Sequence, residues 1–109
     1  MNINAYQKEA MTLLNPDIPK EDVLLNALMG LCGESGEAID LLKKHRFQGH
    51  ALDRDKMIKE LGDVAWYLAE AATGLGVDLS EVLQGNLDKL HARYPKGFDT
   101  ARSQNREAE

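Results

Sequence analysis

The fold is decided by residues 24–42, LLNALMGLCGESGEAIDLL, in which apolar side chains recur every three or four positions. That spacing places them on one face of an α-helix, which we expect to run from residue 19 or 20 to about residue 46. Glu34 falls inside the apolar face, and Glu37 lies one turn further along, at its edge. A carboxylate on a buried face is costly unless it is paired, protonated or bound to a metal ion. The same helix therefore supplies core residues and the first indication of a functional site.

Three further stretches predict helices, at about residues 4–14, 53–75 and 78–94. Asp53 is a suitable N-cap for the second of them, because its carboxylate can accept hydrogen bonds from first-turn amides. The first stretch ends before Pro16, because a residue that precedes proline avoids the α conformation. No segment alternates apolar and polar residues with period two. The sequence therefore predicts an all-α fold, in the form of an antiparallel helical bundle.

Length and composition are those of one small globular domain, which we place at residues 1–98, with a polar, frayed tail at residues 99–109. A chain of 109 residues buries a limited core, so oligomerisation would add stability. The formal net charge of −5 disfavours a nucleic-acid polymer as partner, because such binders present a basic face. Cys32 is the only cysteine, and the N-terminus has neither a basic region nor a long apolar run. We therefore expect a cytoplasmic protein with no membrane partner.

Polar stripes border the apolar faces of the last two predicted helices. The stripe on the third helix consists of Glu60, Asp63 and Tyr67, and that on the fourth consists of Asn86, Lys89 and Arg93. The sequence has four acidic pairs three residues apart, which is close to the roughly three expected by chance. Position is therefore more informative than number, since two acidic pairs lie against apolar faces and a basic stripe on another helix complements them.

Four carboxylates from two facing helices suit a hard cation such as Mg²⁺, which prefers oxygen ligands. Such a metal ion neutralises phosphate charge and activates water, and Lys89 and Arg93 could bind the outer phosphate oxygens. Asn86 can donate and accept hydrogen bonds, and Tyr67 can stack on a base or hydrogen-bond a ligand. A di-iron centre would need Glu-x-x-His pairs, and no histidine lies three residues after a glutamate. The chain also has no P-loop, so phosphates would be held by metal and side chains.

Four motifs, in this order, resemble those of the MazG-like nucleoside triphosphate pyrophosphohydrolases. They are Gly33-Glu34-Ser35-Gly36-Glu37; Glu60-Leu61-Gly62-Asp63-Val64 followed by Trp66-Tyr67; Asn86-Leu87-Asp88-Lys89-Leu90; and Arg93-Tyr94-Pro95. The pattern is ExxE, a spacer, ExxD, then NxxKL and RYP, and it covers about residues 5–98. Each motif is weak alone, but the ordered set is specific.

The resemblance implies an all-α bundle that assembles as a dimer or tetramer, with sites near the subunit interfaces. It implies hydrolysis of NTPs or dNTPs between the α and β phosphates, which gives the nucleoside monophosphate and pyrophosphate. The cofactor would be Mg²⁺, with Mn²⁺ as the alternative. By motif position, the metal ligands and catalytic residues would be Glu34, Glu37, Glu60 and Asp63. The residues in contact with the nucleotide would be Asn86, Lys89, Arg93, Tyr67, Lys44 and Gln7.

Two other functions fit the same residues. The first is a helical module that binds nucleotides or a protein partner without turnover, and the second is a structural dimerisation domain that needs no Mg²⁺. At the level of single residues, Glu34 could form an ion pair with Lys89 or Arg93 inside a packed bundle. The polar stripes could likewise be solvated helix faces. The complete set of four carboxylates favours the enzyme, since a pure binder would not need four metal ligands.

Overall fold

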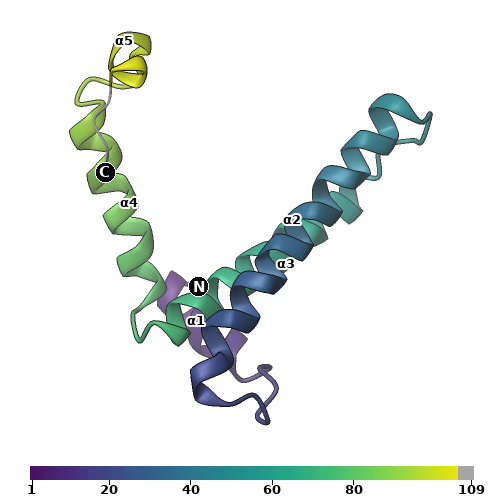
Figure 1. Ribbon diagram of the computed structural model, residues 1–109, viewed down its shortest axis with the longest axis vertical. Helices are drawn as coiled ribbons and strands as arrows, with labels where there is room; N and C mark the ends of the chain where they lie inside the picture. The colour runs from purple at the N-terminus through teal and green to yellow at the C-terminus, as the bar shows by residue number, and fades with distance from the viewer. Residues whose placement is uncertain (106–109) are drawn as a thin grey trace. The chain divides into compact units, whose positions relative to one another are not determined.

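The computed structural model describes residues 1–105, and every regular element in this range is helical. The elements are α1 (Ile3–Met11), the 3₁₀ helix η1 (Lys20–Asp22), α2 (Val23–Phe47), α3 (Arg54–Gly74), α4 (Leu79–Arg93) and α5 (Thr100–Gln104) (Figure 1). They form two compact units, the first spanning Met1–Leu79 and the second beginning at Ser80. Within residues 1–105, no helix combines the length and the apolar character needed to cross a lipid bilayer. The predicted all-α class is confirmed, whereas the antiparallel bundle and its completion by oligomerisation stay predictions.

The centre of the first unit is a helical hairpin, in which α2 and α3 lie side by side (Figure 1). The loop between them starts at the C-cap Gln48, whose amide donates to the carbonyl of Lys44 at 3.0 Å. It ends at Asp53, where Oδ1 accepts from the amide of Lys56 at 3.0 Å, so this predicted N-cap is confirmed. A short loop makes the two helices antiparallel, and the middle of α2 therefore faces the first half of α3.

Side-chain hydrogen bonds anchor α1 to the second half of α3. Trp66 Nε1 donates to the carbonyl of Ala10 at 3.1 Å. Gln7 is buried, and its Nε2 donates to Thr73 Oγ1 at 3.0 Å. Both bonds join side chains to partners far away in the sequence, so they hold the first helix in place once the hairpin has formed.

The first helix is shorter than the sequence predicts. It ends at Met11 instead of residue 14, because the following amides bond back by three residues instead of four. Thr12 donates its amide to the carbonyl of Glu9 at 3.1 Å, and the Thr12 hydroxyl donates to the same oxygen at 2.6 Å. These bonds tighten the last turn and stop the α-helix there.

The segment after Phe98 was expected to fray and instead contains α5. Its N-cap is Asp99, whose Oδ1 accepts from the amide of Arg102 at 3.2 Å. A local cap of this kind satisfies a first-turn amide and stabilises a helical turn even in a polar sequence. The remaining part of the predicted tail, residues 106–109, lies outside the described residues.

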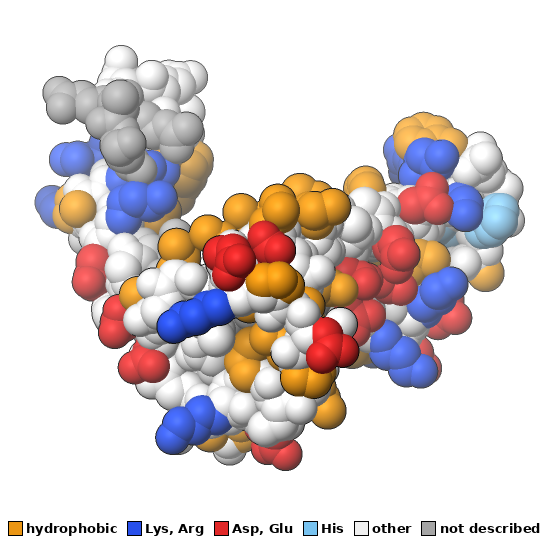
Figure 2. Space-filling model, turned by 60° about the horizontal axis from the view of Figure 1, so that its bottom comes forward, with side chains coloured by type: hydrophobic (Ala, Val, Ile, Leu, Met, Phe, Trp, Pro, Cys, Tyr) orange, Lys and Arg blue, Asp and Glu red, His pale blue; other side chains and the backbone are white. Residues whose placement is uncertain are grey.

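The first unit has a small core made mostly of alanine. Its buried apolar residues are Ala10, Val23, Ala27, Ala69, Ala71, Ala72 and Leu79. Several side chains on the predicted apolar faces are instead exposed, among them Leu28 (47 %), Ile58 (51 %) and Leu61 (57 %). Figure 2 shows hydrophobic side chains gathered among charged ones on one face of the molecule. The single chain therefore leaves apolar side chains of α2 and α3 exposed to solvent.

Candidate metal centre

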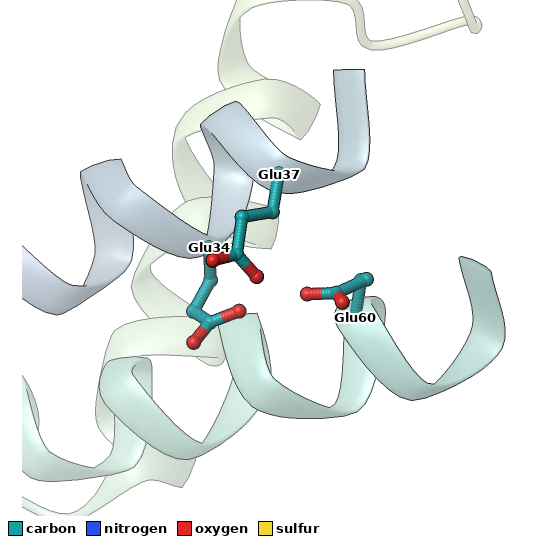
Figure 3. Close-up of side chains that lie close together, drawn as sticks. All are labelled: Glu34, Glu37 and Glu60. Atoms are coloured by element: carbon teal, nitrogen blue, oxygen red, sulfur yellow. The ribbon is translucent and has the colours of Figure 1, made fainter. Parts of the chain in front are cut away.

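Three glutamate side chains converge where α2 faces the first half of α3, as Figure 3 shows. Glu34 and Glu37 come from α2 and are one turn apart, and Glu60 comes from α3. One carboxylate oxygen from each residue lies within 4.8 Å of the other two. The three-residue spacing puts the two α2 carboxylates on the same side of the helix, and the hairpin supplies the third. The structure thus brings together three of the four predicted carboxylates.

Oxygens in this cluster lack hydrogen-bond donors. Oε2 of Glu34 and Oε2 of Glu60 are shielded from solvent. When both carboxylates are ionised, neither oxygen has a hydrogen-bond donor among the described residues. The two groups can bond to each other only through a proton, and this hydrogen bond is the largest cause that raises the pKa of Glu34 to about 7. Burial and the negative charges of Glu37 and Asp63 act in the same direction.

A hard cation fits this arrangement. Mg²⁺ prefers carboxylate oxygens as ligands, and its charge would relieve the repulsion among these carboxylates. The two shielded oxygens of Glu34 and Glu60 are acceptors that need a positively charged or donating partner. The group of three contains neither histidine nor cysteine, so its chemistry suits Mg²⁺ or Mn²⁺ better than a softer metal.

Asp63, the fourth predicted ligand, is exposed and lies one turn after Glu60 on α3. Its charge contributes to the raised pKa of Glu34. Together with Glu60 it borders a surface hollow of about 550 Å³, which Lys56 and Lys59 also line. Asp63 is therefore next to the cluster but is not one of the three carboxylates that converge.

Lys44, which was predicted to contact the nucleotide, is engaged with Asp40. Lys44 Nζ lies 2.9 Å from Asp40 Oδ2, and Lys43 Nζ lies 3.5 Å from Asp40 Oδ1. The hydrogen bond from Lys44 is the main cause that lowers the pKa of Asp40. A nucleotide would therefore have to compete with Asp40 for Lys44.

Tyr67 is half-buried and packs its ring across α2 at Gly30. A Cβ atom at Gly30 would overlap the Tyr67 ring, so glycine permits the close approach of α3 to α2 at this point. Trp66 meets the same ring edge to face, with centroids 5.1 Å apart and planes at 90°. Tyr67 is thus a packing residue in this structure, and its role beside a base stays a prediction.

Gln7 lies among residues of the second half of α3 and the segment that follows it. Its Nε2 donates to Thr73 Oγ1 and, at 3.1 Å, to the carbonyl of Val77. Its Oε1 accepts from the amide of Leu79 at 2.6 Å. Because these bonds use both ends of a buried amide, the geometry gives Gln7 a structural role and offers no support for the predicted nucleotide contact.

The amide and basic stripe lies on α4, in the second unit. The helix predicted for Asn86, Lys89 and Arg93 is present, and their spacing places them on one side of it. Asn86 and Lys89 are exposed, and Arg93 is half-buried. The Arg93 guanidinium carbon lies 5.7 Å from the centroid of the Tyr94 ring. The predicted phosphate contacts of this stripe stay predictions.

The most deeply buried polar side chain among residues 1–105 was not predicted. Glu70 on α3 is 0 % exposed, and both of its carboxylate oxygens accept from Asn26 Nδ2 on α2, at 3.0 and 2.9 Å. The pair links the two helices about two turns from Glu34 along α2. A signal was present, because each is the single polar residue of an apolar run, at residues 24–28 and 68–72.

Comparison with known proteins agrees with the motifs. Residues 22–98 match the family model of the MazG nucleotide pyrophosphohydrolase domain. The Gene 37 protein of Mycobacterium phage L5 is 37 % identical over 114 residues, an alignment that covers 97 % of this chain and 100 % of the phage protein. No solved structure matches the chain. Since the matched residues include the converging carboxylates as well as α4, the chain belongs to the MazG nucleotide pyrophosphohydrolase domain family.

Proposed function

We propose that this protein is a Mg²⁺-dependent nucleoside triphosphate pyrophosphohydrolase, which splits NTPs or dNTPs between the α and β phosphates. The observation that carries the proposal is the convergence of Glu34, Glu37 and Glu60, with shielded oxygens that lack donors. Family membership supports the reaction class. We also propose that the protein acts in the cytoplasm, where nucleoside triphosphates occur and a lone cysteine stays reduced.

The chain's own residues would hold and orient the reactants. Glu34 and Glu37 from α2 and Glu60 from α3 would be the metal ligands, with Asp63 as a fourth carboxylate one turn further along α3. Bound Mg²⁺ would neutralise phosphate charge and lower the pKa of a coordinated water. One carboxylate oxygen of Glu34 and one of Glu60 are shielded from solvent. Charges interact more strongly where water is excluded, so these oxygens would bind a cation strongly.

For the nucleotide we propose contacts from α4. Lys89 and Arg93 would bind phosphate oxygens, because charge-assisted bonds to phosphate are short and strong. Asn86 would meet a phosphate oxygen at the other end of the stripe, since its amide can donate a hydrogen bond. The three side chains lie on the same side of α4, which supports binding of one ligand by all of them. Tyr67 is retained as a candidate beside the base, and Lys44 would first have to leave Asp40.

We propose that the active form is a homo-oligomer, either a dimer or a tetramer. A Cβ atom placed on Gly33, Gly36 or Gly62 would have no neighbouring atom within 4 Å in the described chain. A glycine inside a helix costs about 1 kcal/mol relative to alanine, and within residues 1–105 no close approach to these positions requires glycine. Leu28 and Leu61 are exposed on the same two helices. Close packing of a second copy would account for both observations.

The proposed reaction is tested by identifying the products. With Mg²⁺, we expect the protein to convert at least one NTP or dNTP into the monophosphate and pyrophosphate, detected by chromatography and phosphorus NMR. EDTA should abolish turnover, and so should Glu34→Gln, because both remove the bound cation or a ligand to it. Diphosphate plus phosphate would contradict cleavage between the α and β phosphates. Binding of nucleotides without turnover would favour the alternative, a helical binding module.

The pH dependence of stability tests the cluster independently. In the metal-free fold Glu34 has a pKa of about 7, against an ordinary value of 4.5. Between these values the folded state binds more protons than the unfolded chain, so stability should fall as the pH rises from 4.5 through about 7. Mg²⁺ competes with the proton, so it should raise the thermal midpoint more at about pH 8 than at about pH 6. An equal rise at both pH values would contradict a metal site at Glu34.

A further inference from the structure

The chain reverses direction directly after α4 and brings Phe98 back to the end of that helix. The amide of Tyr94 donates to the carbonyl of Leu90 at 2.8 Å, and the amide of Gly97 donates to the carbonyl of Tyr94 at 3.1 Å. Gly97 has a φ of 91°, a conformation that glycine adopts readily and other residues do not. Phe98 then lies against Tyr94, with ring centroids 5.4 Å apart and planes tilted by 46°. On the other side of Phe98, Asp99 caps α5.

Phe98 thus lies between a hydrogen-bonded turn and a helix cap, and its side chain is 76 % exposed. An exposed ring whose backbone is fixed by a turn and a helix cap loses less conformational freedom on binding than a ring in an irregular segment. A positively charged side chain, that of Arg93, is connected to this ring through Tyr94. The Arg93 guanidinium lies 5.7 Å from the centroid of Tyr94, and Tyr94 is the ring on which Phe98 packs. A cation, a half-buried ring and an exposed ring therefore form a row within the second unit.

This row matches the chemical parts of a nucleotide. Phosphates are anionic and pair with Lys and Arg, whereas a base is a flat π system that stacks on aromatic side chains. We propose that the nucleobase stacks on Phe98 while Lys89 and Arg93 bind phosphates. The inference rests on the proposed function, since it takes the phosphate contacts from there. Phe98 has no hydrogen-bonding group in its ring, so this contact would tolerate different bases.

The competing explanation is that Phe98 packs against a second copy of the chain. The chain offers a matched control in Phe47, which is 78 % exposed and lies at the end of α2 in the first unit. Removing either ring deletes the same exposed apolar surface. A difference between the two variants in nucleotide binding would therefore depend on location and not on the amount of surface lost.

The test compares two probes in the presence of Mg²⁺. One is the α,β-methylene analogue of the best-hydrolysed triphosphate, which cannot be split at that bond, and the other is inorganic tripolyphosphate, which has no base. By calorimetry, Phe98→Ala should weaken the analogue by about 5- to 100-fold, the range expected for one base–aromatic stack, and leave tripolyphosphate binding unchanged. Phe98→Trp should retain the affinity for the analogue. Phe47→Ala should bind both probes as the parent chain does.

Three results would overturn the assignment of Phe98. They are an unchanged affinity for the analogue in Phe98→Ala, equal losses for both probes, and a loss that accompanies a smaller oligomer in light scattering. Failure of the parent chain to bind either probe would instead contradict the proposed function, and the assignment of Phe98 would fall with it. Binding of the probes by the parent chain thus distinguishes failure of the Phe98 assignment from failure of the proposed function.

Discussion

A Glu60→Gln variant is expected to lose Mg²⁺-dependent hydrolysis and to gain stability in the absence of metal. Glu60 faces Glu34 and Glu37 across the hairpin, and the shielded oxygen of Glu34 has no donor. A glutamine amide would supply that donor and remove one negative charge, so the metal-free fold should be stabilised. The same change removes a metal ligand. Losing several kcal/mol of charge stabilisation in the transition state corresponds to a fall of roughly 100-fold or more in kcat/KM.

Turnover and metal-free thermal unfolding measure the two effects on the same sample. Their opposite signs are diagnostic, because a variant that merely folds badly would lose both activity and stability. Glu9→Gln is the matched control, since Glu9 is an exposed glutamate on α1 and the same change of charge there should alter neither quantity. If Glu60→Gln kept its turnover and its stabilisation by Mg²⁺, Glu60 would not be a metal ligand.

The second large effect is expected at Asn26, where alanine should lower the free energy of unfolding by about 3 kcal/mol. Glu70 is 0 % exposed, and Asn26 Nδ2 donates to both of its carboxylate oxygens. Alanine removes that donor and leaves the carboxylate buried without it, a situation far more costly than losing a surface contact. Denaturant unfolding measures this loss of stability. If the unfolding free energy of the variant depends on denaturant concentration with the same slope as that of the parent chain, the two unfolded states are comparable.

Two further variants separate the buried charge from the hydrogen bond. Glu70→Gln keeps an acceptor for Asn26 and removes the charge, so it should cost less than Asn26→Ala. Replacing both residues by leucine should also cost less, because an apolar pair of similar volume often substitutes for a buried polar pair without loss. An Asn26→Ala protein within about 0.5 kcal/mol of the parent chain would show that the carboxylate does not depend on this donor.

Helix boundaries could be predicted from the sequence where a neighbouring residue sets them. Asp53 begins α3 because its side chain reaches the amide of Lys56, three residues away, and that geometry is implicit in the sequence. The predicted end of α1 was wrong by three residues, because the apolar pattern continues to Leu14 whereas the backbone turns at Thr12. The choice between bonds to the third and fourth preceding residue depends on small energy differences that periodicity does not contain.

The candidate site was likewise predictable where residues are close in the sequence, and not where they are far apart. Glu34 and Glu37 share a helix face by helix geometry alone, and a hairpin was enough to expect Glu60 opposite them. The Asp40–Lys44 pair was also within reach of sequence reasoning, because residues four apart on a helix are neighbours. Gln7 was not, since its hydrogen-bond partners lie 66 to 72 residues further along the chain. Long-range partners of this kind are decided by tertiary packing.

The same separation has a consequence for how the chain folds. Contacts between residues so far apart close a long loop and form slowly compared with local ones. Synthesis proceeds from the N-terminus, so α1 leaves the ribosome before Thr73 and Leu79 have been made. Docking of α1 through Gln7 therefore waits until these residues have been made. Until then its binding surface is open to chaperones, or to α3 of another chain in a swapped assembly.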